Sequence, residues 1–148
     1  MSTEALSWDE ATAEAIQDGW FRTGDIAFID DDGFLTIADR AKDMVIRGGE
    51  KIYCAEVEAV VYELDAVAEA AMFSCPDERL GEVPGMAIHV RPGAALSADD
   101  VREIVRERLA AFKVPEYIWF LDDPIPRNAN GKFLKRELRE NLIGTDAD

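Results

Sequence analysis

The chain has 148 residues, of which 48% are hydrophobic, so it is long enough and apolar enough to form one globular domain with a core. Its 31 Asp and Glu residues outnumber its 16 Lys and Arg residues, which gives a formal net charge of −15. This excess of carboxylates argues against nucleic acid and anionic membrane surfaces as partners, because both attract basic patches on proteins.

The start of the chain shows no targeting segment. Residues Met1 to Asp9 lack the basic and apolar parts of a signal peptide, and no apolar run is long enough to cross a bilayer. The two cysteines, Cys54 and Cys75, are too few and too isolated for a zinc site or a disulfide framework. We therefore expect a cytoplasmic protein with no metal site of its own.

The first part of the chain predicts a helical segment and then a β-hairpin. Alanines and acidic residues recur with weak helical spacing from Thr3 to Asp18, and Gly19 ends this pattern. Apolar runs at 26–29 and 34–37 then flank the turn at 30–33, Asp-Asp-Asp-Gly, which is a good hairpin signal. These aspartates lack the ligand spacing of a calcium loop, so we interpret them as turn residues.

A second hairpin is predicted from 44–46 and 51–53, with Gly48-Gly49 at its tip. Glycine suits such a tip because it adopts the positive φ angles that tight turns require. From Ala55 the apolar residues recur at three- and four-residue steps, which predicts a helix.

The second half of the chain alternates strands and helices. Strands are predicted at 67–75 and 84–90, and these two should pair with each other. Ser97 is a good N-cap for a helix whose first turn is acidic. A short strand at 117–121 and an amphipathic helix at 134–142 follow. The predicted fold class is α+β: N-terminal hairpins, then a small mixed β-sheet flanked by helices.

Three segments are richer in glycine and charge than a scaffold requires. They are Gly19-Trp20-Phe21-Arg22-Thr23-Gly24-Asp25, then Asp39-Arg40-Ala41-Lys42-Asp43 running into Arg47-Gly48-Gly49-Glu50-Lys51, and finally Pro126-Arg127-Asn128-Ala129-Asn130-Gly131-Lys132.

The third segment opens a basic stretch. Between Arg127 and Arg139 there are five basic residues and one acid, which indicates a site for an anion such as phosphate. It is not a Walker loop, because Phe133 stands where Ser or Thr is needed and Pro126 occupies the first glycine position. A flexible turn before a basic helix is the structural alternative.

Together these segments resemble the adenylate-forming superfamily, which includes acyl-CoA synthetases, firefly luciferase and the adenylation domains of peptide synthetases. The resemblance runs from Ala11 to Leu142, with the three segments in the family's order. It implies that residues 1–38 form a linker and hairpin segment that joins a large domain missing from this chain. Residues 39–148 would then be the mobile C-terminal lid domain.

The resemblance also implies roles for residues that would meet the nucleotide. Lys132 matches the family's catalytic lysine, which contacts the substrate carboxylate and the α-phosphate during adenylation. Asp25 should bind the ribose hydroxyls, since a carboxylate can accept hydrogen bonds from both of them. Arg40 should lie near the ribose and phosphate.

Other matched positions belong to the movement of the small domain and to the second half-reaction. Lys42 falls at the hinge, although it could also be an ordinary exposed lysine of a hairpin. Gly48, Gly49 and Glu50 should form the loop that faces CoA and its pantetheine arm, with Gly49 allowing the closest approach. A purely structural role of these glycines in the turn is equally open.

The activity that the resemblance implies has two steps. A carboxylic acid and ATP, supplied with Mg2+, give an acyl-adenylate and pyrophosphate; the small domain then rotates, the CoA thiol attacks and AMP leaves. Residues 49–53 and the Ala-Glu-Val-Glu that follows are more similar to acyl- or aryl-CoA ligases than to luciferases, so an acid–thiol ligase, most like a fatty-acid–CoA ligase, is expected. By itself the chain should be inactive, because the ATP phosphate loop and the acyl pocket lie in the large domain.

Two other interpretations remain open. The chain could belong to another branch, an aryl-CoA ligase or a peptide-synthetase adenylation domain, or it could be a stand-alone non-catalytic module of the same fold. Retention of Asp25, Gly49 and Lys132 weighs against the module. Fatty, aryl and short-chain acids are all compatible with this sequence as substrates.

Overall fold

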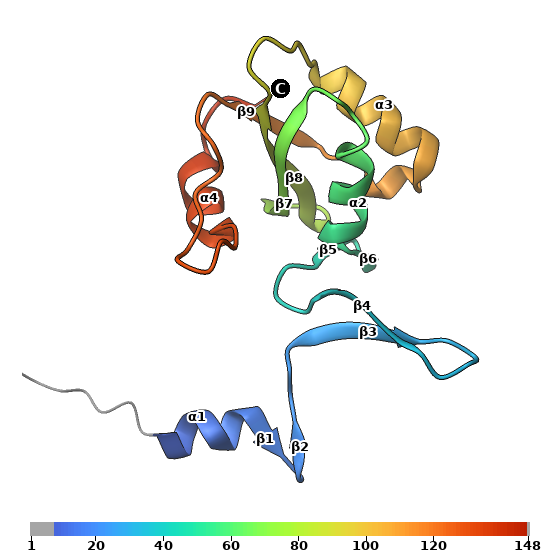
Figure 1. Ribbon diagram of the computed structural model, residues 1–148, viewed down its shortest axis with the longest axis vertical. Helices are drawn as coiled ribbons and strands as arrows, with labels where there is room; N and C mark the ends of the chain where they lie inside the picture. The colour runs from blue at the N-terminus through green and yellow to red at the C-terminus, as the bar shows by residue number, and fades with distance from the viewer. Residues whose placement is uncertain (1–7, 148) are drawn as a thin grey trace, which may run out of the picture. The chain divides into compact units, whose positions relative to one another are not determined.

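The computed structural model describes residues 8–147, and their side chains from residue 12 onward (Figure 1). Contacts within the chain divide it into two compact units, Met1–Lys42 and Asp43–Asp148. The division into 1–38 and 39–148 made from the sequence stays a prediction. Among the described residues, no helix is long and apolar enough to cross a membrane.

The first unit consists of a short helix and two hairpins. The helix ends at Ala15 and not at Asp18, because the next residues pair as a minimal hairpin around Asp18 and Gly19, whose φ angles are 52° and 81°. The part of the predicted helix at 3–7 lies outside the described residues. The elements are α1 (Trp8–Ala15), β1 (Ile16–Gln17), β2 (Trp20–Phe21), β3 (Asp25–Ile29) and β4 (Leu35–Arg40).

The predicted hairpin of β3 and β4 is confirmed, and its turn is closed by an aspartate. Asp30 Oδ1 accepts hydrogen bonds from the backbone N–H groups of Asp32 (3.1 Å) and Phe34 (2.8 Å). Large apolar side chains of this unit are left more than half exposed: Trp20, Phe21, Phe28, Ile29, Phe34, Leu35 and Ile37.

The second unit is a mixed β-sheet with helices on both faces, which confirms the predicted α+β class. Four strands run in the order β6-β5-β8-β7 with antiparallel pairing, and β9 pairs parallel to β8. The elements are β5 (Val45–Arg47), β6 (Glu50–Ile52), α2 (Cys54–Val61), β7 (Val67–Asp77), β8 (Gly81–Val90), α3 (Ala98–Arg108), the 3-10 turn η1 (Ala111–Lys113), β9 (Tyr117–Leu121) and α4 (Lys135–Leu142).

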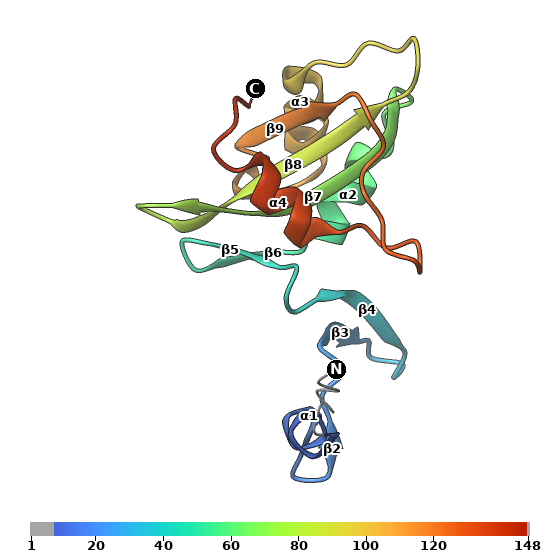
Figure 2. The ribbon, with the colours of Figure 1, turned by 90° about the vertical axis from the view of Figure 1, so that its left-hand side faces the viewer.

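Alternation of side chains along β7 and β8 gives the sheet two apolar faces. Met72 and Met86 point to the face that α2 and α3 cover, where Val57 and Val101 join the same buried cluster. The opposite face carries a second cluster and is covered by α4, as Figures 1 and 2 show. Its buried members are Ala71, Phe73, Cys75, Val83, Ala87, Trp119, Ile125 and Leu138.

The helix predicted after Ser97 is confirmed together with its cap. Ser97 Oγ accepts a hydrogen bond from the Asp100 N–H, and the Asp100 carboxylate accepts one from the Ser97 N–H at 2.9 Å. This reciprocal capping box satisfies two backbone donors that the first turn of a helix otherwise leaves free.

Gly85 on β8 fills a place where the backbone leaves no room for a side chain. A Cβ at this position would overlap the Cys75 sulfur and the Trp119 ring of the second cluster. We expect Gly85→Ala to lower the free energy of unfolding by about 1–3 kcal/mol through overpacking. Urea denaturation followed by tryptophan fluorescence measures this loss, and Gly85→Ala combined with Cys75→Ala should recover part of it. An unchanged stability of Gly85→Ala would contradict the packing described for this face.

Candidate functional site

Asp25 and Arg40, the two residues expected to bind the nucleotide, lie together in the first unit. They face each other across the end of the β3–β4 hairpin, with Arg40 Nε 3.8 Å from Asp25 Oδ1. The N–H of Asp25 donates to Thr23 Oγ1 at 3.1 Å, which orients the turn before β3. The Arg40 side chain is 59% exposed, so the pair is loose and both groups are free to bind other polar groups.

Lys42, the expected hinge residue, is the last residue of the first unit and is exposed. The next residue, Asp43, opens the second unit, and its carbonyl oxygen accepts the Cys54 S–H at 2.6 Å. The chain therefore passes from one compact unit to the other at the position where a hinge is expected.

Gly48, Gly49 and Glu50 form the exposed tip of the β5–β6 hairpin. The φ angles of the two glycines are 57° and 94°, values that residues with a side chain rarely adopt. The Gly48 N–H donates to the Leu80 carbonyl at 2.9 Å, which ties the tip to the turn between β7 and β8. Because no atom lies within 4 Å of a Cβ built on Gly49, backbone is accessible there to a ligand.

Lys132 sits in a closed loop between β9 and α4. Asn128 Oδ1 accepts the N–H groups of Asn130 (3.0 Å) and Lys132 (2.9 Å), and the Asn128 N–H donates to the Lys132 carbonyl at 2.9 Å. Within the described part of the chain, no carboxylate lies in ion-pair range of the exposed Lys132 ammonium. A fixed backbone thus presents an uncompensated positive charge to solvent.

The basic stretch around Lys132 is less positive than its sequence indicates. Three of its five basic residues are neutralised by carboxylates, two of which come from distant parts of the chain. The pairs are Arg127 with Glu69 (2.8 Å), Lys135 with Glu58 (2.7 Å) and Arg136 with Glu140 (2.9 Å).

The Lys135–Glu58 pair is largely buried, with both side chains less than a fifth exposed. Burial lowers the pKa of Lys135, but the charge and hydrogen bond of the facing Glu58 carboxylate, together with smaller contributions from Cys54 and Asp43, hold that pKa above its ordinary value. Lys135 is therefore a structural cation of the α4 N-terminus. Of the two basic residues outside these pairs, Lys132 and Arg139, Lys132 is the exposed one and is the candidate for ligand chemistry. The sequence did not indicate that Glu58 and Glu69 form ion pairs with this stretch, since each lies more than 50 residues from its partner.

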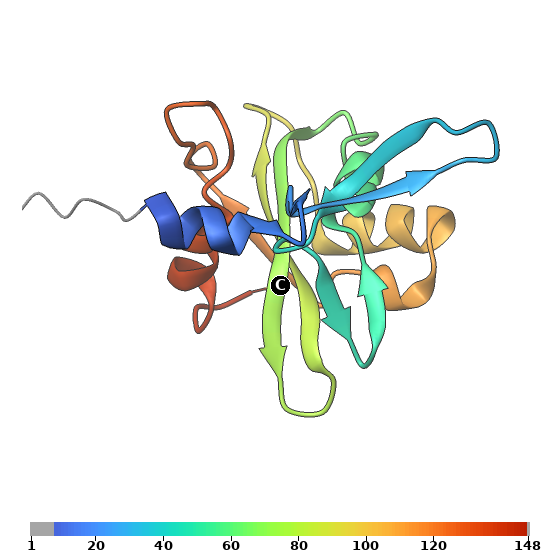
Figure 3. The ribbon, with the colours of Figure 1, turned by 90° about the horizontal axis from the view of Figure 1, so that it is seen from below.

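The glycine tip and the lysine loop lie on opposite sides of the second unit. Figures 2 and 3 show the β5–β6 hairpin, which belongs to the sheet, on one side of this unit and the loop before α4 on the other. The structure therefore does not bring the predicted site residues of this unit together into one pocket.

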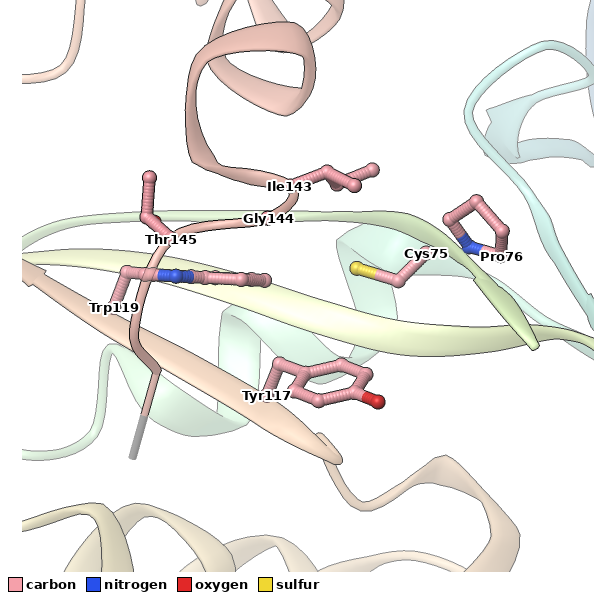
Figure 4. Close-up of a pocket in the computed structure, with 7 residues that line it drawn as sticks. All are labelled: Cys75, Pro76, Tyr117, Trp119, Ile143, Gly144 and Thr145. Atoms are coloured by element: carbon pink, nitrogen blue, oxygen red, sulfur yellow. The ribbon is translucent and has the colours of Figure 1, made fainter.

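A separate pocket of about 290 Å³ lies on the α4 side of the sheet, and sequence gave no indication of it. It is lined by Cys75, Pro76, Tyr117, Trp119 and residues 143–145 (Figure 4). Burial raises the pKa of the Cys75 thiol to about 11, so this sulfur stays protonated and weakly nucleophilic at neutral pH. The lining of the pocket includes none of the site residues that the sequence predicted.

Comparison with known proteins identifies the unit that carries Lys132. Residues 56–132, just over half of the chain, match the family model described as the AMP-binding enzyme C-terminal domain.

Individual relatives agree with this match. A 3-[(3aS,4S,7aS)-7a-methyl-1,5-dioxo-octahydro-1H-inden-4-yl]propanoyl:CoA ligase of Rhodococcus jostii is 49% identical over 88% of this chain and 25% of its own length. The long-chain-fatty-acid–CoA ligase FadD13 of Mycobacterium tuberculosis is 46% identical over 92% of this chain and 27% of its own. The structure of o-succinylbenzoate CoA synthetase (MenE) from Bacillus subtilis with its acyl-adenylate intermediate superposes with a TM-score of 0.78, at 38% identity over 90% of this chain and 26% of that one.

The chain spans about a quarter of the length of these relatives. The family match ends at Lys132 and begins after the glycine tip, while the relatives and the solved structure cover about nine tenths of the chain. The chain therefore belongs to the family of AMP-binding enzyme C-terminal domains.

Proposed function

We propose that this chain is the mobile C-terminal domain of an ATP-dependent, AMP-forming acyl-CoA synthetase, and we call the protein that combines it with a large domain the complete ligase. The observation that carries the proposal is the placement of the β5–β6 hairpin and the loop before α4 on opposite sides of one compact unit. A domain that turns about Lys42 could present each side in turn to one active site.

In the adenylation step, Lys132 contacts the acid's carboxylate and the α-phosphate of ATP. Its ammonium offsets the negative charge that builds up as a carboxylate oxygen attacks phosphorus and pyrophosphate leaves. The absence of an ion-pair partner for Lys132 among the described residues supports this role, because no ion pair has to be broken before the ammonium contacts the substrate. Asp25 accepts hydrogen bonds from the ribose hydroxyls, and Arg40 lies near the ribose and phosphate.

In the thioester step, the tip formed by Gly48, Gly49 and Glu50 faces the acyl-adenylate and the pantetheine arm of CoA. The CoA thiol releases its proton to solvent, its sulfur attacks the acyl carbon, and AMP leaves with the electron pair of the broken carbon–oxygen bond. The positive φ angles and the open space beside Gly49 support close approach of the pantetheine to backbone.

The large domain is the main partner, on the same polypeptide or as a separate one. The relatives are about four times as long as the matched region, and among the described residues of the first unit seven large apolar side chains are more than half exposed, which such a domain would cover. ATP would enter as its Mg2+ complex, bound mostly by the large domain. We place the ligase in the cytoplasm, where ATP and CoA are available.

The acid itself is proposed only as a class, a carboxylic acid. The relatives are named for acids as different as a long-chain fatty acid and o-succinylbenzoate.

Complementation tests the proposal. A relative's ligase truncated after its large domain is assayed for CoA-ester formation with and without this 148-residue chain added in trans. Restored formation that depends on ATP, acid and CoA is expected, and a chain carrying Lys132→Ala should restore far less. If the wild-type chain restores nothing with several large domains, the non-catalytic module gains support instead.

A further inference from the structure

Glu69, near the start of β7, makes contacts that the sequence did not predict. Its side chain is only 17% exposed and binds two donors from the segment after β9. Oε2 accepts the Ile125 N–H at 2.6 Å, and Oε1 accepts Arg127 Nη2 at 2.8 Å. Burial raises the pKa of Glu69, but the hydrogen bonds from Arg127 and Ile125 and the positive charge of Arg127, with a smaller contribution from His89, lower it below its ordinary value, so that the carboxylate is ionised at neutral pH.

Arg127 also contacts the loop that contains Lys132. Its second terminal nitrogen, Nη1, donates to the Gly131 carbonyl at 2.8 Å, while the guanidinium carbon lies 4.2 Å from the centre of the Phe133 ring. Arg127 therefore holds the residues on both sides of Lys132. The guanidinium suits this task because it is planar and carries several N–H donors. It can therefore donate hydrogen bonds to two acceptors and stack on an aromatic ring at the same time.

The C-terminal end of the loop, at the start of α4, is also attached to the rest of the unit. Lys135 pairs with Glu58, and Glu58 Oε1 also accepts the Met72 N–H of β7 at 2.7 Å. Both ends of the loop are thus attached to the same strand, one through Glu69 and the other through Glu58. A loop that only connected β9 to α4 would not need a largely covered carboxylate at each end.

We propose that Glu69 and Arg127 are positioning residues that fix the Lys132 loop to β7, so that the lysine is presented in one geometry during adenylation. Because the lysine side chain is flexible, its reach is accurate only if its backbone is held. This inference rests on the proposed function for its catalytic part but not for its structural part. The two parts are tested separately.

The structural part is tested by NMR on the 148-residue chain. In the wild type, backbone order parameters at Gly131 and Lys132 are expected near the rigid value of about 0.85, and in Glu69→Gln below about 0.6. Arg127→Lys keeps the charge but loses the two-ended bridge, so it should loosen the loop in the same way. The matched control is Glu140→Gln, which removes an exposed ion pair on α4 and should leave the loop unchanged. A loop that stays rigid in Glu69→Gln would overturn the attachment.

The catalytic part is tested in the complete ligase by assaying the two half-reactions separately. Glu69→Gln should slow acid-dependent ATP–pyrophosphate exchange by about 10- to 100-fold, as expected for a misplaced catalytic group. Thioester formation from preformed acyl-adenylate should stay within about twofold, since it uses the opposite side of the domain. An equal loss in both half-reactions, or none in the exchange, would overturn the positioning role. A wild-type ligase without any exchange would instead refute the proposed function, while the NMR result would still stand.

Discussion

Replacing Lys132 by alanine in the complete ligase is expected to lower the rate of acid adenylation by about 100- to 1,000-fold, the usual loss when a group that stabilises developing charge is removed. Thioester formation from preformed acyl-adenylate should fall less than about threefold, because only the transition state of the first step contains the charge that Lys132 offsets. ATP–pyrophosphate exchange and single-turnover transfer to CoA measure the two steps separately.

The control for this variant is Arg136→Ala, which removes a basic residue of the same stretch. Arg136 is 92% exposed and, within the part of the chain that the structure describes, forms an ion pair only with Glu140 one helical turn away, so both half-reactions should keep wild-type rates. Equal damage to both steps by Lys132→Ala would remove the reason for assigning this lysine to adenylation.

Replacing Gly49 by alanine should produce the opposite pattern, a loss in the thioester step. The added methyl group would project from the exposed tip at a φ of 94°, into the space through which the pantetheine arm is proposed to pass. We expect thioester formation to fall by about 10- to 100-fold from the displaced substrate, with adenylation little changed. Strain at this φ should also cost about 1–2 kcal/mol of stability.

Gly93→Ala is the control that separates the loss of stability from the loss of thioester formation. Gly93 also has a positive φ, 79°, and no atom within 4 Å of a built Cβ, but it lies in the turn after β8 and has no proposed ligand. It should lose similar stability in thermal unfolding while both half-reactions stay intact. If Gly49→Ala and Gly93→Ala were equally active in the thioester step, the tip would have only a structural role.

Much of the fold could be predicted because its signals are local. The Asp30 turn, the Gly48-Gly49 tip and the Ser97 cap each depend on side chains within a few residues, and the structure contains all three. The hairpin of β1 and β2 was missed, since two-residue strands have no periodic pattern to detect. The parallel pairing of β9 with β8 could not be predicted from the sequence either, because it joins residues about 30 positions apart.

The site was predictable only where its residues form motifs. Asp25 and Arg40 were singled out separately, and the hairpin register places them opposite each other. The basic stretch, by contrast, was overestimated, because Glu58 and Glu69 meet it only through the folding of α2 and β7. Long-range ion pairs leave no periodic or motif signal in a single sequence, so the attachment of the Lys132 loop became visible only in three dimensions.

The central claim, that the complete ligase forms acyl-CoA through an acyl-adenylate, is tested most directly by its nucleotide products. The complete ligase is incubated with a panel of carboxylic acids, ATP, Mg2+ and CoA, and the products are quantified by chromatography and mass spectrometry. The account predicts equal amounts of AMP, pyrophosphate and acyl-CoA for the accepted acid, and enzyme-bound acyl-adenylate when CoA is left out. Formation of ADP and phosphate with the acyl-CoA, or no acid-dependent turnover of ATP with any member of the panel, would contradict it.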